Sequence, residues 1–405
     1  MKIGVYGGSF NPPHLGHLQA AREAVRYLKL DRLLLIPTGL PPHKQFAEGT
    51  PSNSDRLKMT ELMGEQIALE TGIEVQTLDV EMQRAGKSYT ADTMRSLRKQ
   101  YPADDFWLFV GTDMFLSFQN WYRPAEILSI AGLCAFARNQ GDGGEVFQRQ
   151  ASDLQRIFPG CRIAVAALPE VVDISSTELR EALQKKQGQQ YLTAQIYGYI
   201  LRKHLYGTIC DLKRLTIEEL RPVALSYLKA KRVAHVLGTE QTAVKLAEKY
   251  GADPRKASIA ALLHDCTKRL SMEEQQALCK QYGIALDALE QKTLKLLHAK
   301  TGAAIAQDVF GVDDEIYQAI FWHTTGKADM TRLEKVIYLA DYIEPTRDFP
   351  GVQELRQTVW EDLDRGLLKG LTMTVEEMEE MGNPIHQDTI LACNFLRGKE
   401  NEKKT

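Results

Sequence analysis

The chain has 405 residues, of which 44% are hydrophobic and 25% are charged. This composition is ordinary for a globular protein and excludes a mainly disordered one, while the length exceeds what one hydrophobic core usually supports, so we expect two domains. A formal net charge of -3 gives no electrostatic footprint for nucleic acid, which we therefore exclude as a partner, although small nucleotide substrates need only a few local donors.

The cysteines and the hydropathy of the sequence indicate the cellular compartment in which the protein is expected. The six cysteines form no CxxC pair and lie mostly inside apolar runs, which indicates buried free thiols. The chain shows no signal-like start and no apolar run of membrane-spanning length. Free thiols are typical of a reducing compartment. We therefore expect a cytoplasmic protein with no membrane partner.

Short aliphatic runs alternate with helical patterns over the first half of the chain. We predict strands at residues 2–6, 33–37, 106–110, 133–138 and 162–168. We predict helices at residues 15–28, 55–70, 90–101 and 177–186. This alternation predicts an α/β fold with a doubly wound, mainly parallel, Rossmann-like sheet, which binds ligands at the carboxyl ends of its strands.

In the second half the strand signal ends and helical patterns dominate. They cover residues 222–231, 241–250, 256–263, 333–343 and 352–371. We therefore predict an all-α second domain. Gly207 and a short polar stretch separate the two patterns, so we place the domains at residues 1–206 and 207–405. The lysine-rich residues 398–405 are expected to form a frayed tail.

A glycine-rich motif directly follows the first predicted strand. Residues 7–17 read Gly-Gly-Ser-Phe-Asn-Pro-Pro-His-Leu-Gly-His and lead into the first predicted helix. Glycines at such a turn let backbone amides approach a phosphate, and the helix N-terminus favours an anion. His14 and His17 lie three apart, so both rings can point at one phosphate, and Gly16 leaves room beside them. Taken alone, the turn would suit any α/β protein, and the histidines would suit caps or surface positions.

Further motifs follow in order and make the first half resemble a known family. They are Thr38-Gly39-Leu40-Pro41-Pro42-His43-Lys44, Ser88-Tyr89-Thr90-Ala91-Asp92-Thr93, Gly111-Thr112-Asp113, Asn120-Trp121, Ala137-Arg138 and Ile174-Ser175-Ser176-Thr177-Glu178-Leu179-Arg180. This half resembles the HxGH nucleotidylyltransferases and, within them, bacterial nicotinate mononucleotide adenylyltransferase. The resemblance implies that the phosphate of nicotinate mononucleotide attacks the α-phosphorus of ATP, giving deamido-NAD and pyrophosphate, with no covalent enzyme intermediate. Mg²⁺ would enter with ATP.

The resemblance also assigns residues to the two substrates. Catalytic roles fall to His14, His17, Lys44 and Arg180. The ATP-binding residues are Gly8, Ser9, Phe10, His17, Gly111, Asp113, Ser176 and Arg180. The residues for nicotinate mononucleotide are Lys44, Tyr89, Thr90 and Trp121, which combine an aromatic face with amide donors.

Two questions stay open for this half. The preference for nicotinate over nicotinamide depends on backbone donors and loop shape, which a sequence does not display. The acceptor is alternatively a phosphopantetheine or a sugar phosphate, although Trp121 and residues 88–93 favour a pyridine nucleotide. Taken alone, Trp121 suits a hydrophobic core and Asp113 suits a loop cap.

Polar side chains interrupt apolar helical patterns in the second half. His235 opens one helical pattern, His264 and Asp265 end another, and Asp341 lies inside the apolar run 336–343. Such residues on an apolar face are costly unless they are hydrogen-bonded or bound to metal. A lone histidine would suit a satisfied core position, but this combination indicates a shared metal centre, and imidazole with carboxylate suits iron, manganese or zinc.

Residues 225–371 resemble the HD superfamily of metal-dependent phosphohydrolases. The motifs Leu297-His298, Trp322-His323-Thr324 and Leu339-Ala340-Asp341-Tyr342-Ile343-Glu344-Pro345-Thr346-Arg347 are similar to those of bacterial HD-domain enzymes that split diadenosine tetraphosphate into two ADP. The resemblance implies the metal ligands His235, His264, Asp265 and Asp341, with His298 and His323 either completing a second metal site or contacting substrate phosphates. Asp265 would bridge two ions and is the implied catalytic residue. Lys268 and Arg347 are candidate phosphate contacts, and solvated surface charge explains Arg347 equally well.

Other functions stay open for the second half. It alternatively acts on guanosine tetraphosphate or a nucleoside monophosphate, or is a nucleotide sensor without turnover, although a complete ligand set favours turnover. We also hypothesise that the fusion places removal of a toxic adenylylated dinucleotide beside an enzyme that uses ATP. The existence of a homo-oligomer and any transfer between the two sites stay undetermined.

Overall fold

A computed structural model of the protein describes residues 1–42, 45–137, 143–168, 172 and 174–402. The chain divides into two compact units, Met1–Ile209 and Cys210–Thr405. Among the described residues, no helix is both long enough and apolar enough to cross a membrane.

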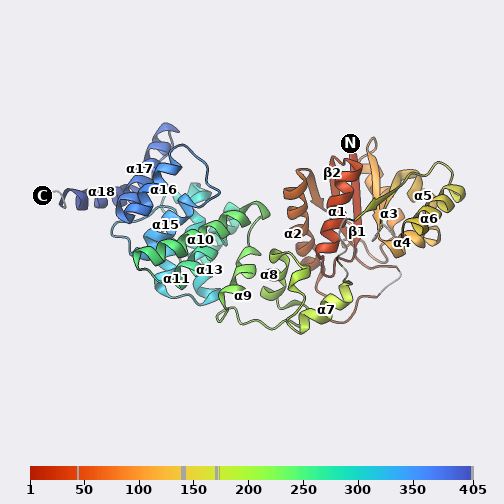
Figure 1. The fold of residues 1–405 in the computed structure, drawn as a ribbon, viewed down its shortest axis with the longest axis horizontal. Helices are drawn as coiled ribbons and strands as arrows, with labels where there is room; N and C mark the ends of the chain where they lie inside the picture. The colour runs from red at the N-terminus through yellow and green to blue at the C-terminus, as the bar shows by residue number, and fades with distance from the viewer. Residues whose placement is uncertain (43–44, 138–142, 169–171, 173, 403–405) are drawn as a thin grey trace. The chain divides into compact units, whose positions relative to one another are not determined.

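The N-terminal unit is built on a parallel six-stranded sheet (Figure 1). Its strands are β1 (Lys2–Gly8), β2 (Arg32–Pro37), β3 (Glu74–Thr77), β4 (Asp105–Val110), β5 (Ala131–Ala137) and β6 (Ile163–Ala167). They lie in the order β3-β2-β1-β4-β5-β6, and every neighbouring pair is parallel. The order reverses between β1 and β4, so the carboxyl ends of these two strands flank the crevice where doubly wound folds bind ligands. The predicted α/β fold is confirmed.

Helices cover both faces of this sheet because successive strand residues point to opposite sides. The helices are α1 (Leu15–Leu28), α2 (Asn53–Thr71), α3 (Thr90–Gln100), α4 (Thr112–Leu116), α5 (Pro124–Ile130), α6 (Gly143–Ile157), α7 (Ser176–Gln184) and α8 (Ala194–Arg202). Leu33 and Leu35 of β2 pack with α1, α2 and α8, whereas Leu34 and Ile36 belong to the core under α3 to α6. The sheet therefore separates two hydrophobic cores.

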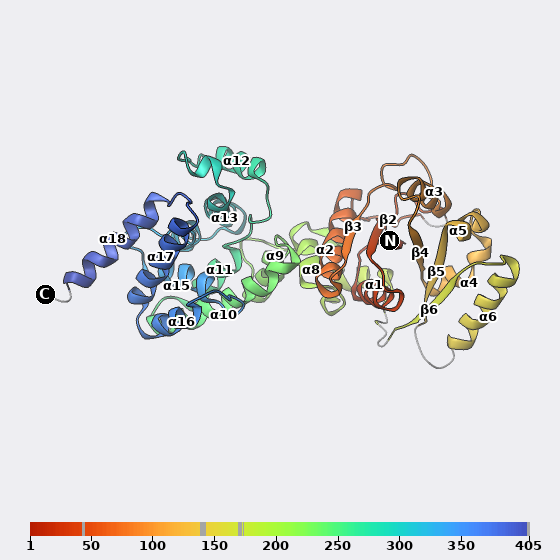
Figure 2. The same cartoon turned by 90° about the horizontal axis from the view of Figure 1, so that it is seen from above.

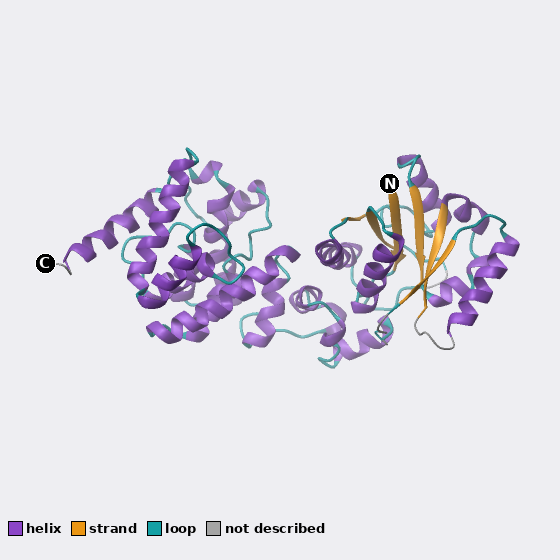
Figure 3. Ribbon diagram, turned by 45° about the horizontal axis from the view of Figure 1, so that its top comes forward, coloured by secondary structure: helices purple, strands orange, loops and turns teal. Residues whose placement is uncertain are grey.

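The C-terminal unit is helical, and no strand occurs among its described residues (Figure 2; Figure 3). Its helices are α9 (Ile217–Leu225), α10 (Val233–Tyr250), α11 (Pro254–Leu263), α12 (Met272–Gln281), α13 (Leu294–Phe310), α14 (Asp314–Phe321), α15 (Arg332–Ile343), α16 (Val352–Glu361), α17 (Leu363–Glu380) and α18 (Gln387–Glu402). The prediction of an all-α second domain is confirmed.

Several boundary predictions were wrong, among them the helix predicted over residues 241–250, which begins at Val233. The helix predicted over residues 222–231 begins at Ile217, because a capping box of Thr216 and Glu219 starts it earlier. The pattern over residues 352–371 is two helices, because Asp362 adopts an extended conformation and caps α17. The expected frayed tail belongs to α18 as far as residue 402.

The cysteines are all free, but their burial differs. Four are buried, whereas Cys161 and Cys210 are partly exposed, so the prediction of buried thiols fails for these two. Burial raises the pKa of the Cys134 thiol to about 12, which keeps this thiol protonated and unreactive at neutral pH.

Candidate active sites

The turn after β1 brings two histidines together at the N-terminus of α1. His14 Nδ1 accepts the Gly16 N–H and His17 Nδ1 accepts the His14 N–H, each at 3.2 Å. A backbone N–H can only donate, so both Nδ1 atoms are acceptors and a neutral ring carries its proton on Nε2. Burial lowers the pKa of His17 well below its ordinary value, and His14 adds to the shift. His17 thus offers a neutral N–H donor where a helix N-terminus already favours an anion.

Neighbouring side chains hold these rings in place. The His14 and His17 ring centroids lie 3.9 Å apart, and Phe10 meets His17 edge-on at 5.3 Å. Phe10 is fully buried, so its side chain supports the His17 ring and leaves only its backbone for a ligand. A Cβ atom on Gly16 would lie 3.0 Å from the His14 ring, which explains the glycine between the two histidines.

Arg180 reaches the same turn from α7. Its Nη1 donates to the Asn11 carbonyl at 2.9 Å, and its Nη2 donates to Thr177 Oγ1 at 3.0 Å. Ser176 is the first residue of α7, whose N-terminus is closed by a capping box of Ser175 with Glu178. Arg180 of the last motif therefore contacts the backbone of the first motif at Asn11, 169 residues away in the chain.

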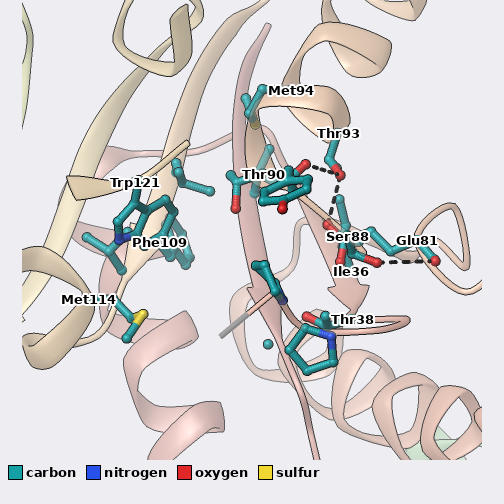
Figure 4. A pocket seen from close by; sticks show the side chains of 18 of the residues that line it. Ile36, Thr38, Glu81, Ser88, Thr90, Thr93, Met94, Phe109, Met114 and Trp121 are labelled. Carbon is teal, nitrogen blue, oxygen red and sulfur yellow. Dashed lines mark hydrogen bonds between the residues drawn. The ribbon is translucent and has the colours of Figure 1, made fainter. Parts of the chain in front are cut away.

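A cavity of about 360 Å³ opens at the carboxyl ends of β1 and β4. The residues predicted for ATP or the pyridine nucleotide that line it are Gly8, Ser9, Tyr89, Thr90, Gly111 and Trp121. Figure 4 shows Trp121 and Met114 on one side of the cavity and Ser88 and Glu81 on the other. Asp113 is exposed on α4 and does not line this cavity. Lys44 and Arg138 lie outside the described residues.

Six side chains converge in the C-terminal unit. They are His235 on α10, His264 and Asp265 at the end of α11, His298 on α13, His323 after α14 and Asp341 on α15. Ligand atoms of His235, His264 and Asp341 lie within 4.8 Å of one another, as do those of His264, Asp265 and His323. His298 Nε2 lies 3.3 Å from Asp265 Oδ1 and 3.1 Å from His323 Nε2. All the residues predicted as metal ligands are therefore gathered in one place.

The donor atoms of this cluster fit a divalent metal ion. His235 Nε2, His264 Nε2 and Asp265 Oδ1 are buried and have no hydrogen-bond partner among the described residues. His264 Nδ1 lies 2.6 Å from the Ala261 carbonyl, and His323 Nδ1 lies 2.7 Å from the Ile320 carbonyl. A carbonyl only accepts, so Nδ1 carries the proton and Nε2 offers its lone pair.

The spacing of the donors supports the same conclusion. Two ligands at right angles, each about 2.1 Å from an ion, lie about 3.0 Å apart. The Nε2 atoms of His298 and His323 are separated by 3.1 Å, and His235 Nε2 lies 3.0 Å from Asp341 Oδ1. Both pairs therefore have the separation of neighbouring ligands on one ion.

Charges around the cluster stabilise the protonation states that metals require. Burial by itself would raise the pKa of Asp265, but His264, His298 and Lys268 lower it well below its ordinary value. Asp341 behaves likewise, since His235, His264 and Arg347 outweigh the effect of burial. Burial also lowers the pKa of His264, His298 and His323. The cluster thus combines carboxylates with neutral imidazoles, the forms that coordinate metal ions.

Cations line the same centre. Arg347 Nη2 donates to Asp341 Oδ1 at 2.7 Å, and Lys268 Nζ lies 2.9 Å from His298 Nε2. Arg232, which sequence analysis did not single out, contacts Asp265. These three side chains are partly exposed, so their positive charges can meet a polyphosphate.

Comparison with known proteins assigns both units. The Cytidylyltransferase-like family model matches residues 5–182, and the HD domain model matches residues 232–346. Over 206 residues the chain is 37% identical to a "Probable nicotinate-nucleotide adenylyltransferase" of Carboxydothermus hydrogenoformans, covering 51% of this chain and 98% of that protein. Over 180 residues it is 40% identical to the "Bis(5'-nucleosyl)-tetraphosphatase, symmetrical" of Bacillus subtilis, covering 44% of this chain and 96% of that protein. The chain belongs to both families.

A solved structure is also similar to this chain. It comes from Clostridium acetobutylicum and is described as a predicted HD superfamily hydrolase involved in NAD metabolism. It is 39% identical, covers 46% of this chain and 98% of its own, and has a TM-score of 0.44.

A third cluster of possible ligands in the HD-containing unit is occupied by a basic side chain. Ligand atoms of Asp287, Glu290 and His386 lie within 4.8 Å of one another. His386 Nδ1 accepts the Asp388 N–H at 3.3 Å, so its Nε2 carries a proton toward the two carboxylates. Lys300 pairs with Glu290. This cluster therefore forms an ion-pair network between the segment before α13 and His386.

Sequence analysis missed a buried carboxyl group in the adenylyltransferase-like unit. Glu81 is 6% exposed, lines the cavity and accepts a hydrogen bond from Thr93 Oγ1 at 2.8 Å. Burial raises its pKa, although Thr93 and Arg84 oppose the shift. Tyr122 was also missed, and its ring lies tilted against that of Tyr89, with 4.6 Å between the ring centroids. Glu81 lies in a loop, where no helical or strand periodicity marks a buried position. In the sequence, only its partner Thr93, which belongs to the 88–93 motif, pointed to this part of the site.

Proposed function

We propose that the chain is a bifunctional enzyme. The N-terminal unit transfers AMP from ATP to nicotinate mononucleotide, giving deamido-NAD and pyrophosphate. The C-terminal unit hydrolyses diadenosine tetraphosphate to two ADP. The observation that carries the proposal is the position of the proton on the two sets of histidine rings. At the N-terminus of α1 the Nε2 atoms carry the proton and can donate to an anion, whereas in the HD cluster the Nε2 atoms carry a lone pair and can bind a metal ion. The names of relatives that match each unit support the two substrates.

Adenylyl transfer in this scheme depends on positioning. An oxygen of the nicotinate mononucleotide phosphate bonds to the α-phosphorus of ATP while the bond to the pyrophosphate oxygen breaks. His14 and His17 donate from Nε2 to the ATP phosphates, and Arg180 and Lys44 add positive charge there. Mg²⁺ accompanies ATP as part of that substrate. Donors aimed at developing charge accelerate such a step without a nucleophilic side chain.

The pyridine end of the cavity supports a nicotinate substrate. Thr90 is the first residue of α3, and the N-cap Tyr89 supplies no side-chain acceptor to that first turn. Unpaired amides of a first turn favour a carboxylate, which nicotinate has and nicotinamide lacks. Trp121, across the cavity from the Ser88 side, supplies an aromatic face for the ring (Figure 4).

The HD cluster supports metal-dependent hydrolysis. His235, His264, Asp265 and Asp341 would hold one divalent ion, and Asp265 with His298 and His323 would hold a second. A bound iron, manganese or zinc ion supplies Lewis-acid activation of water and of a phosphoryl group. Lys268, Arg232 and Arg347 bind and orient the polyphosphate by neutralising its charge. Hydrolysis at one of the two central phosphorus atoms breaks the bond to the oxygen between them and releases two ADP.

The test is a product assay on the purified full-length chain. One reaction contains ATP, Mg²⁺ and nicotinate mononucleotide, and a second contains diadenosine tetraphosphate with Fe²⁺ or Mn²⁺. We expect deamido-NAD in the first and ADP as the sole nucleotide in the second. Faster turnover of nicotinamide mononucleotide would reject the nicotinate assignment. ATP plus AMP, or faster hydrolysis of guanosine tetraphosphate or a nucleoside monophosphate, would reject symmetrical cleavage of diadenosine tetraphosphate.

A further inference from the structure

Glu344 is a fully buried carboxylate directly behind the HD cluster. It follows α15, the helix that carries Asp341, and its exposed fraction is 0%. Its Oε1 lies 3.0 Å from His235 Nδ1. The other nitrogen of that ring, Nε2, faces the cluster and lies 3.0 Å from Asp341 Oδ1. His235 therefore stands between the candidate metal ligands and Glu344.

The surroundings of Glu344 hold its carboxylate in one orientation. The Thr346 N–H donates to Oε2 at 2.6 Å, and Thr346 Oγ1 donates to Oε1 at 2.5 Å. Both oxygens of Glu344 therefore act as hydrogen-bond acceptors. Oε1 is thus placed to accept from His235 Nδ1, and in this Nδ1–H form of the ring the lone pair on Nε2 points at the cluster.

Gly238 makes room for this arrangement. It lies inside α10, three residues after His235, where glycine lowers helix stability relative to alanine. A Cβ atom at this position would lie 2.6 Å from Glu344 Oε2 and 3.2 Å from Pro345 Cδ. The absence of a side chain at residue 238 is therefore what allows the carboxylate to reach His235.

We propose that Glu344, in the space left by Gly238, is a positioning residue that fixes the Nδ1–H form of His235 and so makes its Nε2 a metal ligand. This role rests on the proposed metal centre. A carboxylate behind a histidine also fixes the ring orientation and increases the basicity of the coordinating nitrogen.

Glu344→Gln gives a specific expectation because the Thr346 N–H orients the new amide. That N–H requires an oxygen at the Oε2 position, so the amide NH₂ takes the position facing His235 Nδ1. Nδ1 then becomes an acceptor and the ring proton moves to Nε2, where it blocks coordination. We expect metal affinity to fall by about 10- to 100-fold, the usual effect of losing such a partner.

The experiment uses the full-length chain labelled with ¹⁵N-histidine, stripped of metal with a chelator. The ¹⁵N shifts report which nitrogen of His235 carries the proton, and competition with a chelator measures Mn²⁺ affinity. We expect Nδ1–H in the unmodified chain, and Nε2–H with weaker Mn²⁺ binding in Glu344→Gln. Gly238→Ala keeps the carboxylate but displaces it, so we expect a smaller loss of Mn²⁺ affinity.

Glu240→Gln is the matched control. Glu240 is also a buried carboxylate on α10, but its hydrogen bonds go to Arg221 and Ser258. We expect this substitution to leave the His235 resonance and Mn²⁺ affinity unchanged.

The outcomes separate this role from the metal centre itself. An unchanged His235 resonance in Glu344→Gln, with or without a lower Tm, would overturn the positioning role. If the unmodified chain binds no divalent ion, the proposed hydrolytic centre fails. The ¹⁵N shifts of the metal-free chain would still decide whether Glu344 sets the proton on His235.

Discussion

The histidines of the two units use the same ring atom in opposite ways. In the adenylyltransferase-like unit, Nδ1 of His14 and His17 accepts a backbone N–H. In the HD cluster, Nδ1 of His264 and His323 donates to a backbone carbonyl. Nε2 consequently carries a proton in the first unit and a lone pair in the second. The backbone partner of Nδ1 thus decides whether a histidine suits an anion or a cation.

The largest expected effect comes from His264→Gln. His264 belongs to both metal groups of the HD cluster, and an amide oxygen is a weaker ligand for iron, manganese or zinc than an imidazole nitrogen. A metal ion contributes several kcal/mol to phosphoryl transfer, so we expect hydrolysis of diadenosine tetraphosphate to fall by about 1,000-fold or more. Deamido-NAD synthesis by the same preparation should be unchanged and serves as the internal control. Near-normal hydrolysis would contradict a metal role for His264.

His17 provides the corresponding test in the first unit. The amide of Gln can place an N–H near the position of Nε2, whereas Ala cannot. Loss of one preorganised donor typically lowers kcat by about 100- to 1,000-fold, so we expect such a loss of deamido-NAD synthesis in His17→Ala and a smaller one in His17→Gln. Hydrolysis of diadenosine tetraphosphate should be unaffected in both variants. Equal losses would show that His17 acts through its helix cap with His14 rather than as a donor.

Sequence patterns predicted much of this contrast, for identifiable reasons. The spacing of His14 and His17 on one helical turn predicts that both rings can point at one phosphate, and the alternation of strand and helix patterns predicts the parallel sheet. Family motifs predicted His235, His264 and Asp341, whose ligand atoms lie within 4.8 Å of one another. Helix ends were harder to predict. Proline is a strong signal for the start of a helix, so the sequence predicts Pro222 as the first residue of α9, whereas the helix begins after its N-cap Thr216.

Proton placement lay beyond the sequence. His235 and Glu344 are 109 residues apart, and their contact depends on a gap at Gly238 that appears only when α10 and α15 pack together. Glu81 likewise becomes a cavity residue only when its loop meets α3, where Thr93 hydrogen-bonds to it. Such partners are set by tertiary packing, which local periodicity does not encode.

The two units should also respond differently to acid. Burial lowers the pKa of His264, His298 and His323 in the HD cluster, and of His17 in the first unit. When the folded pKa lies below the unfolded value of about 6.5, the unfolded chain binds more protons. The stabilisation is therefore complete above about pH 6.5 and decreases as the pH falls.

Thermal unfolding of the metal-free chain at pH 8, 7, 6 and 5.5 would measure this effect. We expect the Tm to fall below about pH 6.5, with the larger shift in the transition assigned to the C-terminal unit. His323→Gln removes one of the titrating rings and should reduce the pH dependence. A Tm that is constant across this range, or a larger shift in the N-terminal unit, would contradict the expected difference.

The smallest expected effect separates the two substrates within the first unit. Trp121 lines the cavity but packs against Phe118 at 5.0 Å, so one face of its indole is already used. Stacking of the other face on a pyridine ring contributes about 0.5–1.5 kcal/mol, which corresponds to an increase of about 2- to 10-fold in KM for nicotinate mononucleotide in Trp121→Ala. Trp121→Phe should retain most of the affinity, and KM for ATP should not change in either variant. A rise in KM for ATP alone would place adenine, rather than the pyridine, against Trp121. In that case the N-terminal unit would bind phosphates at the histidine turn and the adenine base in its cavity. The HD unit differs because it depends on individual ligand atoms.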